Sequence, residues 1–171
     1  MRTIETVRGA LALATAAVLL AAARPANAQD VGIEVGSTPA AVTIEDLEGN
    51  PVDLGQWIGK KPVVFQFWAT WCPLCEALEP KVAAAKQRFG EKVEVVFVAV
   101  AVNQTKRSIQ RHLRDRPMPG PVLWDTDGKA TRAFKAPTTS YIVVLDAAGK
   151  VTYTGVGDDQ DVATAVARVV N

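Results

Sequence analysis

The stretch Phe67-Trp68-Ala69-Thr70-Trp71-Cys72-Pro73-Leu74-Cys75 holds both cysteines of the 171-residue chain. An apolar run precedes it and a helical pattern follows it. A helix that begins at Pro73 places its free N–H groups and the positive end of its dipole beside Cys72. This environment favours the thiolate, the form of cysteine that attacks disulfides. Cys75 would lie one turn further in, close enough to form a disulfide with Cys72. The stretch therefore predicts a dithiol redox site between a strand and a helix.

Two other roles for the cysteine pair fit the chain less well. A purely structural bridge would close a very short loop and stabilise little. A zinc site would need two further ligands, but the chain contains one histidine and no other cysteine. Redox chemistry is the better interpretation.

Length and composition indicate one ordinary domain. The chain is 49% hydrophobic and 22% charged, which suffices for a single hydrophobic core. It shows no repeat and no low-complexity tract. We expect one domain over the part of the chain that remains after export.

The N-terminus resembles a secretory signal. Arg2 and Arg8 flank a short charged segment, Gly9 to Ala23 is an uncharged run rich in Ala and Leu, and Ala26-Asn27-Ala28 is typical of a cleavage site. We predict a signal peptide at residues 1–28 and a single exported domain at 29–171. The alternative is an uncleaved membrane anchor. Either way the domain would be exported, to the periplasm or another extracytoplasmic space.

Charge and compartment narrow the function further. Cleavage would remove three of 19 basic and one of 18 acidic residues, which leaves a net charge of −1. Such a chain has no basic field to attract nucleic acid or an anionic membrane. In an oxidising compartment a disulfide persists unless a dedicated reductant removes it, so the cysteine pair needs a redox partner to cycle.

The pattern before and after the cysteines predicts a βαβ unit. Pro62 to Trp68 is typical of a strand buried on both faces, with Gln66 its one polar residue. Pro73 to Phe89 predicts a helix that continues through a kink at Pro80 and is capped by Gly90. Val93 to Val102 predicts a central strand parallel to the first.

Shorter elements surround this unit. They are a leading hairpin (41–44 and 52–54), a basic and solvated surface helix (105–115), a short strand (122–124), a short helix (129–134), a second hairpin (141–145 and 151–154), and a last helix that Asp158 or Asp159 caps and that ends at Val170.

These residues together resemble the exported thioredoxin-fold thiol–disulfide oxidoreductases of the TlpA-like group, which includes the cytochrome c maturation thioredoxins. The resemblance rests on the cysteine stretch, on Pro80 and on Ala136-Pro137-Thr138-Thr139, and it covers essentially the whole chain after the signal. It implies an α/β thioredoxin fold with an N-terminal β-hairpin and an inserted helix and strand at 105–124.

The resemblance also implies roles for single residues. Cys72 corresponds to the exposed nucleophile and Cys75 to the buried resolving cysteine. Pro137 corresponds to a cis-proline whose loop lies against the disulfide and pairs with the substrate backbone. Trp71 corresponds to an aromatic shield, while Trp68 is expected in the core. The implied substrate-binding residues are Trp71, Pro73, Leu74, Ala136 and Pro137, and no cofactor or metal is implied.

Two acids expected from the resemblance are missing. Gln66 stands where thioredoxins bury an acid, and Leu78 stands where relatives often carry glutamate. We expect Gln66 to be a hydrogen-bonded neutral residue of the core. Glu79, four residues after Cys75, shares its helical face and could serve through water. We expect instead that Glu79 is an ordinary surface residue.

The leading functional hypothesis is a disulfide reductase for exported proteins, such as apocytochrome c, kept reduced by a membrane-embedded thiol donor. Leu74 brings neither charge nor a donor to the cysteines, which argues against a strongly oxidising site. A disulfide oxidase or isomerase of the same fold is the runner-up. A copper-binding module that uses Cys72, Cys75 and His112, and a thiol peroxidase that uses Thr70, fit the spacing less well.

Overall fold

The strand that precedes the two cysteines is an inner strand of a mixed sheet. The computed structural model describes residues 31–170, and their seven-stranded sheet has the order β2-β1-β5-β4-β3-β6-β7. The strands are β1 (Thr43–Asp46), β2 (Pro51–Asp53), β3 (Val63–Trp68), β4 (Glu94–Val100), β5 (Val122–Asp125), β6 (Tyr141–Leu145) and β7 (Val151–Val156). The helices are α1 (Pro73–Phe89), α2 (Lys106–Asp115), α3 (Lys129–Ala133) and α4 (Val162–Ala167).

β3 is buried along its whole length, as a run that is apolar on both faces predicts. It pairs in parallel with β4 and antiparallel with β6, so that Val64 stands opposite Val95 on one side and Val144 on the other. The predicted parallel pairing of the first two strands is therefore confirmed, and β3, α1 and β4 form the predicted βαβ unit.

The predicted leading hairpin and inserted strand extend the sheet beyond β4. β5 pairs in parallel with β4, and β1 pairs antiparallel with both β2 and β5. At the opposite edge β6 and β7 form the second predicted hairpin. This order is the α/β thioredoxin fold that the sequence predicts, with its N-terminal hairpin and its inserted helix and strand.

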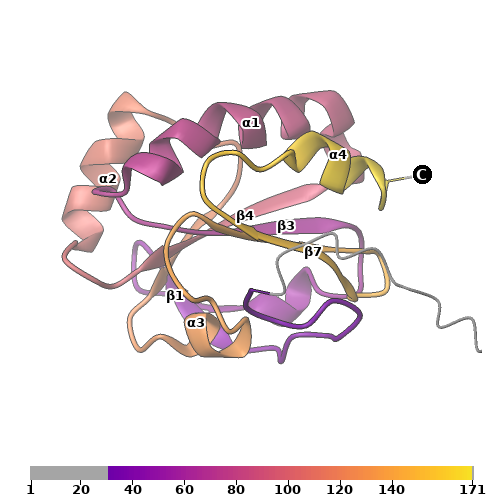
Figure 1. Ribbon diagram of the computed structural model, residues 1–171. Helices are drawn as coiled ribbons and strands as arrows, with labels where there is room; N and C mark the ends of the chain where they lie inside the picture. Colours follow the sequence, from indigo (N-terminus) through magenta and orange to yellow (C-terminus); the bar gives the residue numbers. More distant parts are fainter. Residues whose placement is uncertain (1–30, 171) are drawn as a thin grey trace, which may run out of the picture.

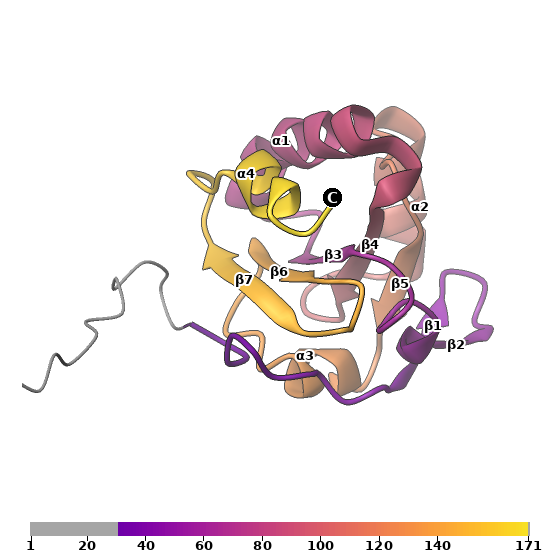
Figure 2. The same cartoon turned by 90° about the vertical axis from the view of Figure 1, so that its right-hand side faces the viewer.

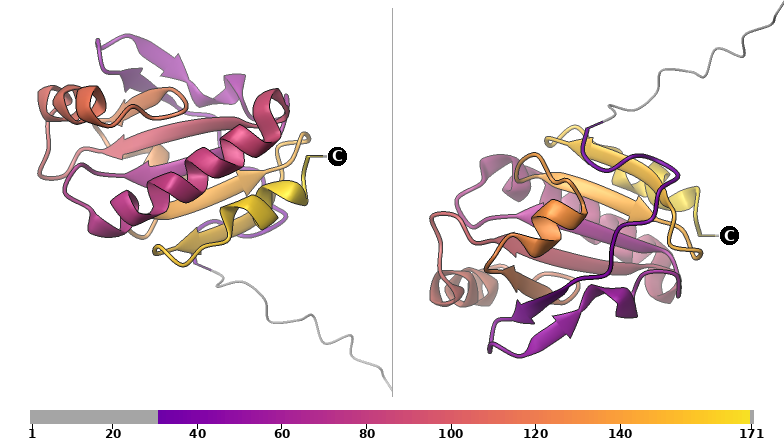
Figure 3. Two further views of the ribbon diagram at one scale, coloured as in Figure 1. Left: turned by 90° about the horizontal axis from the view of Figure 1, so that it is seen from above. Right: turned by 90° about the horizontal axis from the view of Figure 1, so that it is seen from below.

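Helices cover both faces of the sheet. Figures 1 and 2 show α1, α2 and α4 on one face, and α3 with the N-terminal segment on the other. Seen from above, α1 crosses the strands diagonally with α4 beside it, and seen from below α3 covers the sheet (Figure 3).

Alternation along β3 divides its side chains between two hydrophobic cores. We call the layer under α1, α2 and α4 the helical core; it contains Val64, Trp68, Cys75, Leu78 and Val82. The layer on the α3 side is the aromatic core; it contains Phe65, Phe67, Phe134 and Tyr141. Trp68 is fully buried, so its predicted place in the core is confirmed.

α1 runs through Pro80 without ending and closes at Gly90, whose φ of 54° is the left-handed conformation that glycine adopts readily. Both features were predicted. Cys75, Leu78, Val82 and Ala85 are the buried residues of this helix, and their spacing of three or four forms one stripe on the sheet. Packing of this stripe offsets the hydrogen bond that a proline removes from a helix.

α4 differs from its predicted bounds. Its N-cap is Asp161, whose carboxylate accepts a hydrogen bond from the Thr164 N–H at 3.0 Å, and the helix ends at Ala167. Hydrogen bonds from the side chain of Thr164 and from its backbone N–H lower the pKa of Asp161. The prediction of a cap at Asp158 or Asp159 is wrong because these residues belong to the turn before α4.

α2 is not the fully solvated helix that its basic composition predicts. Ile109 is fully buried in the helical core, and Leu113 packs against that core. The basic residues therefore occupy one side of an amphipathic helix.

The predicted signal peptide at residues 1–28 lies outside the described residues. Within residues 31–170, no helix is both long and apolar enough to cross a membrane.

Candidate active site

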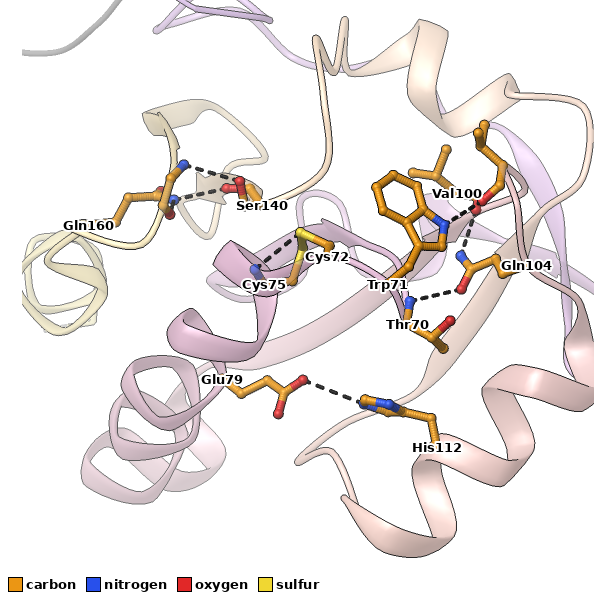
Figure 4. Close-up of a disulfide and its surroundings, with 12 residues drawn as sticks. Thr70, Trp71, Cys72, Cys75, Glu79, Val100, Gln104, His112, Ser140 and Gln160 are labelled. Atoms are coloured by element: carbon orange, nitrogen blue, oxygen red, sulfur yellow. Dashed lines mark hydrogen bonds and ion pairs between the residues drawn. A yellow bond between two sulfur atoms is a disulfide. The ribbon is translucent and has the colours of Figure 1, made fainter.

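The cysteine pair lies where β3 leads into α1. Cys72 is the N-cap of α1 and Pro73 occupies the first turn, where the missing N–H of proline is no loss. The two cysteines form a disulfide, with their Cα atoms 5.2 Å apart. The Cys75 N–H donates a hydrogen bond to the Cys72 Sγ at 3.1 Å (Figure 4). The helix N-terminus thus faces one sulfur, as the sequence predicts.

The two sulfurs differ in access. Cys72 is 7% exposed and Cys75 is 1% exposed, so Cys72 is the more accessible of the two. An incoming thiolate or disulfide can reach Cys72 first, while Cys75 is covered by the first turn of α1. This order agrees with the expected nucleophile and resolving cysteine.

An apolar rim surrounds Cys72. Trp71, Leu74 and Val102 are among the large hydrophobic residues that the fold leaves exposed. The Trp71 Nε1 donates to the Val102 carbonyl at 2.7 Å, which holds the indole beside the disulfide. Trp71 and Leu74 were predicted. Val102 was not, although it extends the valine run beyond the end of β4.

Gln104 braces the loop that carries the cysteines, and sequence reasoning missed it. Its Oε1 accepts from the Thr70 N–H at 2.9 Å, across 34 residues, and its Nε2 donates to the Val100 carbonyl at 2.6 Å. One amide therefore ties the cysteine loop to the end of β4. No local pattern marks this residue.

The loop before β6 completes the rim. Ala136 and Pro137 line a pocket of about 230 Å³ together with Trp71, Val100, Val102, Thr131, Thr138 and Thr139. Trp71, Ala136 and Pro137, which were predicted as site residues, thus line one pocket. The expected contact of the proline loop with the disulfide stays a prediction.

The expected cis bond at Pro137 is wrong. Residues 31–170 contain no cis peptide bond. The chain turns into β6 through Lys135 and Ser140, which have φ values of 47° and 59°. These two residues, one on each side of Pro137, have positive φ values and change the direction of the chain. The peptide bond before Pro137 therefore keeps its intrinsically favoured trans form.

Ser140, not Pro137, directly precedes β6, and it lies on the opposite side of the disulfide from Trp71 in Figure 4. Its carbonyl accepts from the Gln160 Nε2 at 3.0 Å, and its hydroxyl accepts from the Gly157 N–H at 3.2 Å. Gln160 also accepts from the Tyr153 hydroxyl at 3.2 Å. Burial raises the pKa of Tyr153, which keeps that hydroxyl a neutral donor.

Comparison with known proteins decides the family. The family model described as Redoxin matches residues 34–169. The chain belongs to the Redoxin family. The thiol–disulfide oxidoreductase ResA of Bacillus thuringiensis is 26% identical over 119 residues, which cover 70% of this chain and 68% of that protein. ResA of Bacillus subtilis is 29% identical over 119 residues, 70% of this chain and 65% of that protein.

Solved structures share the fold of this redoxin. A secreted disulfide oxidoreductase of Mycobacterium tuberculosis, homologous to E. coli DsbE, has a TM-score of 0.64 at 24% identity and covers 74% of this chain and 95% of its own. A thiol:disulfide interchange protein of the thioredoxin family from Chlorobium tepidum has a TM-score of 0.65 at 22% identity and covers 81% and 99%. Family, fold and cysteine pair together make the chain a thioredoxin-fold thiol–disulfide oxidoreductase.

A polar cluster joins α1 to α2 below the disulfide of this redoxin. The Glu79 Oε1 lies 3.6 Å from the His112 Nε2, and the Glu79 Oε2 lies 3.8 Å from the Arg116 Nη1. Arg116 also donates to Glu76, and this bond raises the pKa of Arg116. Glu79 is thus not the plain surface glutamate that was more expected, because its side chain is 21% exposed and faces α2.

His112 does not complete a copper site with the cysteines. Its ring packs against Trp68, with centroids 5.4 Å apart, and in Figure 4 it turns toward Glu79. Among residues 31–170, no group of three or more potential ligands could hold a metal ion.

The expected hydrogen bonds of Gln66 are absent. Its amide is fully buried, and neither its oxygen nor its nitrogen has a partner in the structure. The prediction of a hydrogen-bonded core amide is therefore wrong. Its neighbours on the adjacent strands are Phe97 and Ile142, which offer no polar side chain.

Proposed function

We propose that this redoxin reduces disulfides of exported proteins. Cys72 attacks the substrate disulfide, and Cys75 then resolves the mixed disulfide. The predicted signal peptide (1–28) would direct the domain (29–171) out of the cytoplasm. One similar solved structure is that of a secreted disulfide oxidoreductase, which supports export of this domain.

The weak stabilisation of a Cys72 thiolate carries the proposed direction. A strongly oxidising dithiol needs an unusually stable thiolate in its reduced form. In the described structure one N–H, that of Cys75, donates to the Cys72 sulfur. Pro73 has no N–H, and Leu74 has no polar side chain. The Glu76 carboxylate in the same helical turn pairs with Arg116, so it brings no uncompensated charge to Cys72. This site therefore favours a reductant.

The partners follow from the same chemistry. Each turnover leaves the Cys72–Cys75 disulfide, which an oxidising compartment does not reduce by itself. A membrane-embedded thiol donor would restore the dithiol. The apolar rim of Trp71, Leu74, Pro137 and Val102 would contact the polypeptide around the substrate disulfide, with Ala136 at its edge. Cysteine pairs that await haem, as in apocytochrome c, are candidate substrates.

The reduction potential tests the direction. Equilibration of the purified domain with glutathione buffers should give a potential near that of thioredoxin, about −270 mV, rather than that of DsbA, about −120 mV. A step of about 30 mV is a tenfold change in the equilibrium constant, so these extremes differ by about five such steps. A value near −120 mV would reject the reductase and favour the oxidase.

A further inference from the structure

Three side chains in or beside the helical core have buried polar atoms without a hydrogen-bond partner within the protein. They are Gln66 with both amide atoms, Trp68 with its Nε1, and His112 with its Nε2. Gln66 and Trp68 are alternate residues of β3 and point to the same face of the sheet. The Trp68 ring packs against that of His112. Buried polar atoms are normally paired with protein or with ordered water, so this grouping indicates a site for internal water.

Glu79 of α1 lies next to this group of polar side chains and contacts His112. The Glu79 Oε1 lies 3.6 Å from the His112 Nε2, which is beyond a direct hydrogen bond but within ion-pair distance. The two side chains are only 21% and 18% exposed. The other charged groups that face the pair are Arg116, which contacts Glu79, and Glu76, which contacts Arg116.

The buried cysteine needs a route for its proton. Cys75 must become a thiolate before it can attack a mixed disulfide, yet it is almost fully covered. Glu79 follows Cys75 by four residues, so the two side chains are neighbours on the surface of α1, with Cβ atoms about 5–6 Å apart. Figure 4 shows Glu79 about one turn along α1 from the disulfide, with His112 of α2 facing it.

We propose that Glu79 and His112 form a proton relay for Cys75, through water held by Gln66 and Trp68. The Cys75 thiol passes its proton through water to the Glu79 carboxylate, which His112 orients. The Cys75 thiolate then attacks Cys72 of the mixed disulfide. The Cys72–Cys75 bond forms, the bond from Cys72 to the substrate sulfur breaks, and the substrate leaves as a thiolate that takes its proton from solvent. Two electrons pass from the dithiol to the substrate disulfide.

The relay rests on thiol–disulfide exchange but not on its direction. When the Cys72–Cys75 disulfide is opened, the same groups return a proton to Cys75. An oxidase would therefore need the relay as much as a reductase.

Stopped-flow oxidation of the reduced protein by excess dithiobis(nitrobenzoate) separates the two cysteines. Attack by Cys72 releases a first coloured thiolate at a rate that depends on reagent concentration. Attack by Cys75 releases the second at a rate that does not. The first phase reports the exchange activity itself, so its loss would count against the function and not against the relay.

Glu79→Gln should slow the second phase by about tenfold or more at neutral pH and leave the first phase unchanged. The defect should shrink as the pH rises, because Cys75 then ionises without help. Glu76→Gln is the matched control, since it removes a carboxylate one turn earlier that also contacts Arg116. Equal slowing by Glu76→Gln, or a Glu79→Gln defect that does not change with pH, would overturn the relay.

His112→Asn and Gln66→Leu test the remaining members. His112→Asn should slow the second phase less than Glu79→Gln, because the carboxylate remains. Gln66→Leu keeps the volume of the side chain but removes the amide that would hold water. It should slow the second phase while the protein stays folded. An unchanged second phase in Gln66→Leu would overturn the role of the water site.

Discussion

The two faces of β3 differ in how well their polar groups are satisfied. On the aromatic side, the Tyr141 hydroxyl accepts from the Ile33 N–H at 3.0 Å and donates to the Phe134 carbonyl at 3.4 Å. On the helical side, Gln66 and Trp68 keep polar atoms without a partner. The polar groups on one face of β3 are thus paired within the protein, whereas those on the other face have no partner within the protein.

The unsatisfied face is the one that holds the cysteines. Unpaired buried polar groups cost stability, and native proteins keep them mainly where function needs them. We expect the polar groups of the aromatic core to add more stability than those of the helical core, because they are paired within the protein. In the relay proposed above, the helical core gives up part of its stability for the chemistry at Cys75.

Phe65→Ala should show the largest effect. Phe65 is fully buried in the aromatic core, against Phe134 with ring centroids 4.8 Å apart. Removal of a buried phenyl ring costs about 3–5 kcal/mol of unfolding free energy. Denaturant unfolding measures this loss. A loss below about 1 kcal/mol would remove the distinction between the two cores.

Tyr141→Phe should cost less, about 1–3 kcal/mol, because it leaves the buried N–H of Ile33 without an acceptor. The volume of the side chain is almost unchanged, so the loss reports the hydroxyl. Denaturant unfolding of the variant measures it. An unchanged stability would mean that the aromatic face is no better satisfied than the helical one.

Gln66→Leu should be neutral or stabilising, by up to about 2 kcal/mol, because it removes a buried amide without breaking a hydrogen bond within the protein. The same unfolding assay measures it. A loss of more than about 1 kcal/mol would show that Gln66 has partners that stabilise the fold, which contradicts the comparison.

Each side of the sheet also contains a tyrosine whose pKa is raised by burial, Tyr141 in the aromatic core and Tyr153 against the helical core. A raised pKa means that folding favours the neutral form. This stability is complete below a pH of about 10 and is lost as the pH rises through the folded pKa. The free energy of unfolding should therefore fall above that pH. We expect this loss to be smaller than the effects of the three substitutions above. Unfolding curves of Tyr141→Phe and Tyr153→Phe across this range should each be flatter than those of the unmodified chain.

Much of the fold follows from local signals. The buried run of β3, the cysteine pair at a helix start, Pro73 in the first turn and Gly90 at the C-cap each act within a few residues. The chemistry of Cys72 and Cys75 is local in the same sense, because a helix N-terminus and its first turn suffice to expose one sulfur and cover the other.

The surroundings of the site depend on contacts between distant residues. Gln104 reaches the cysteine loop from beyond β4, Gln160 reaches Ser140 from beyond β7, and His112 meets Glu79 from another helix. No spacing rule predicts such pairs. The sequence also did not predict the trans bond at Pro137. The positive φ angles of Lys135 and Ser140, which lie on either side of it, have no local sequence signal.

The roles of the two cysteines are the central claim, and trapping tests them most directly. Cys75→Ser should accumulate mixed disulfides with exported protein substrates, because Cys72 still attacks and nothing resolves the product. Cys72→Ser should accumulate none, because the remaining sulfur is covered by α1. Non-reducing electrophoresis of the two variants, each reversed by added dithiol, gives the comparison. Equal trapping by both variants, or trapping by Cys72→Ser alone, would contradict the assignment.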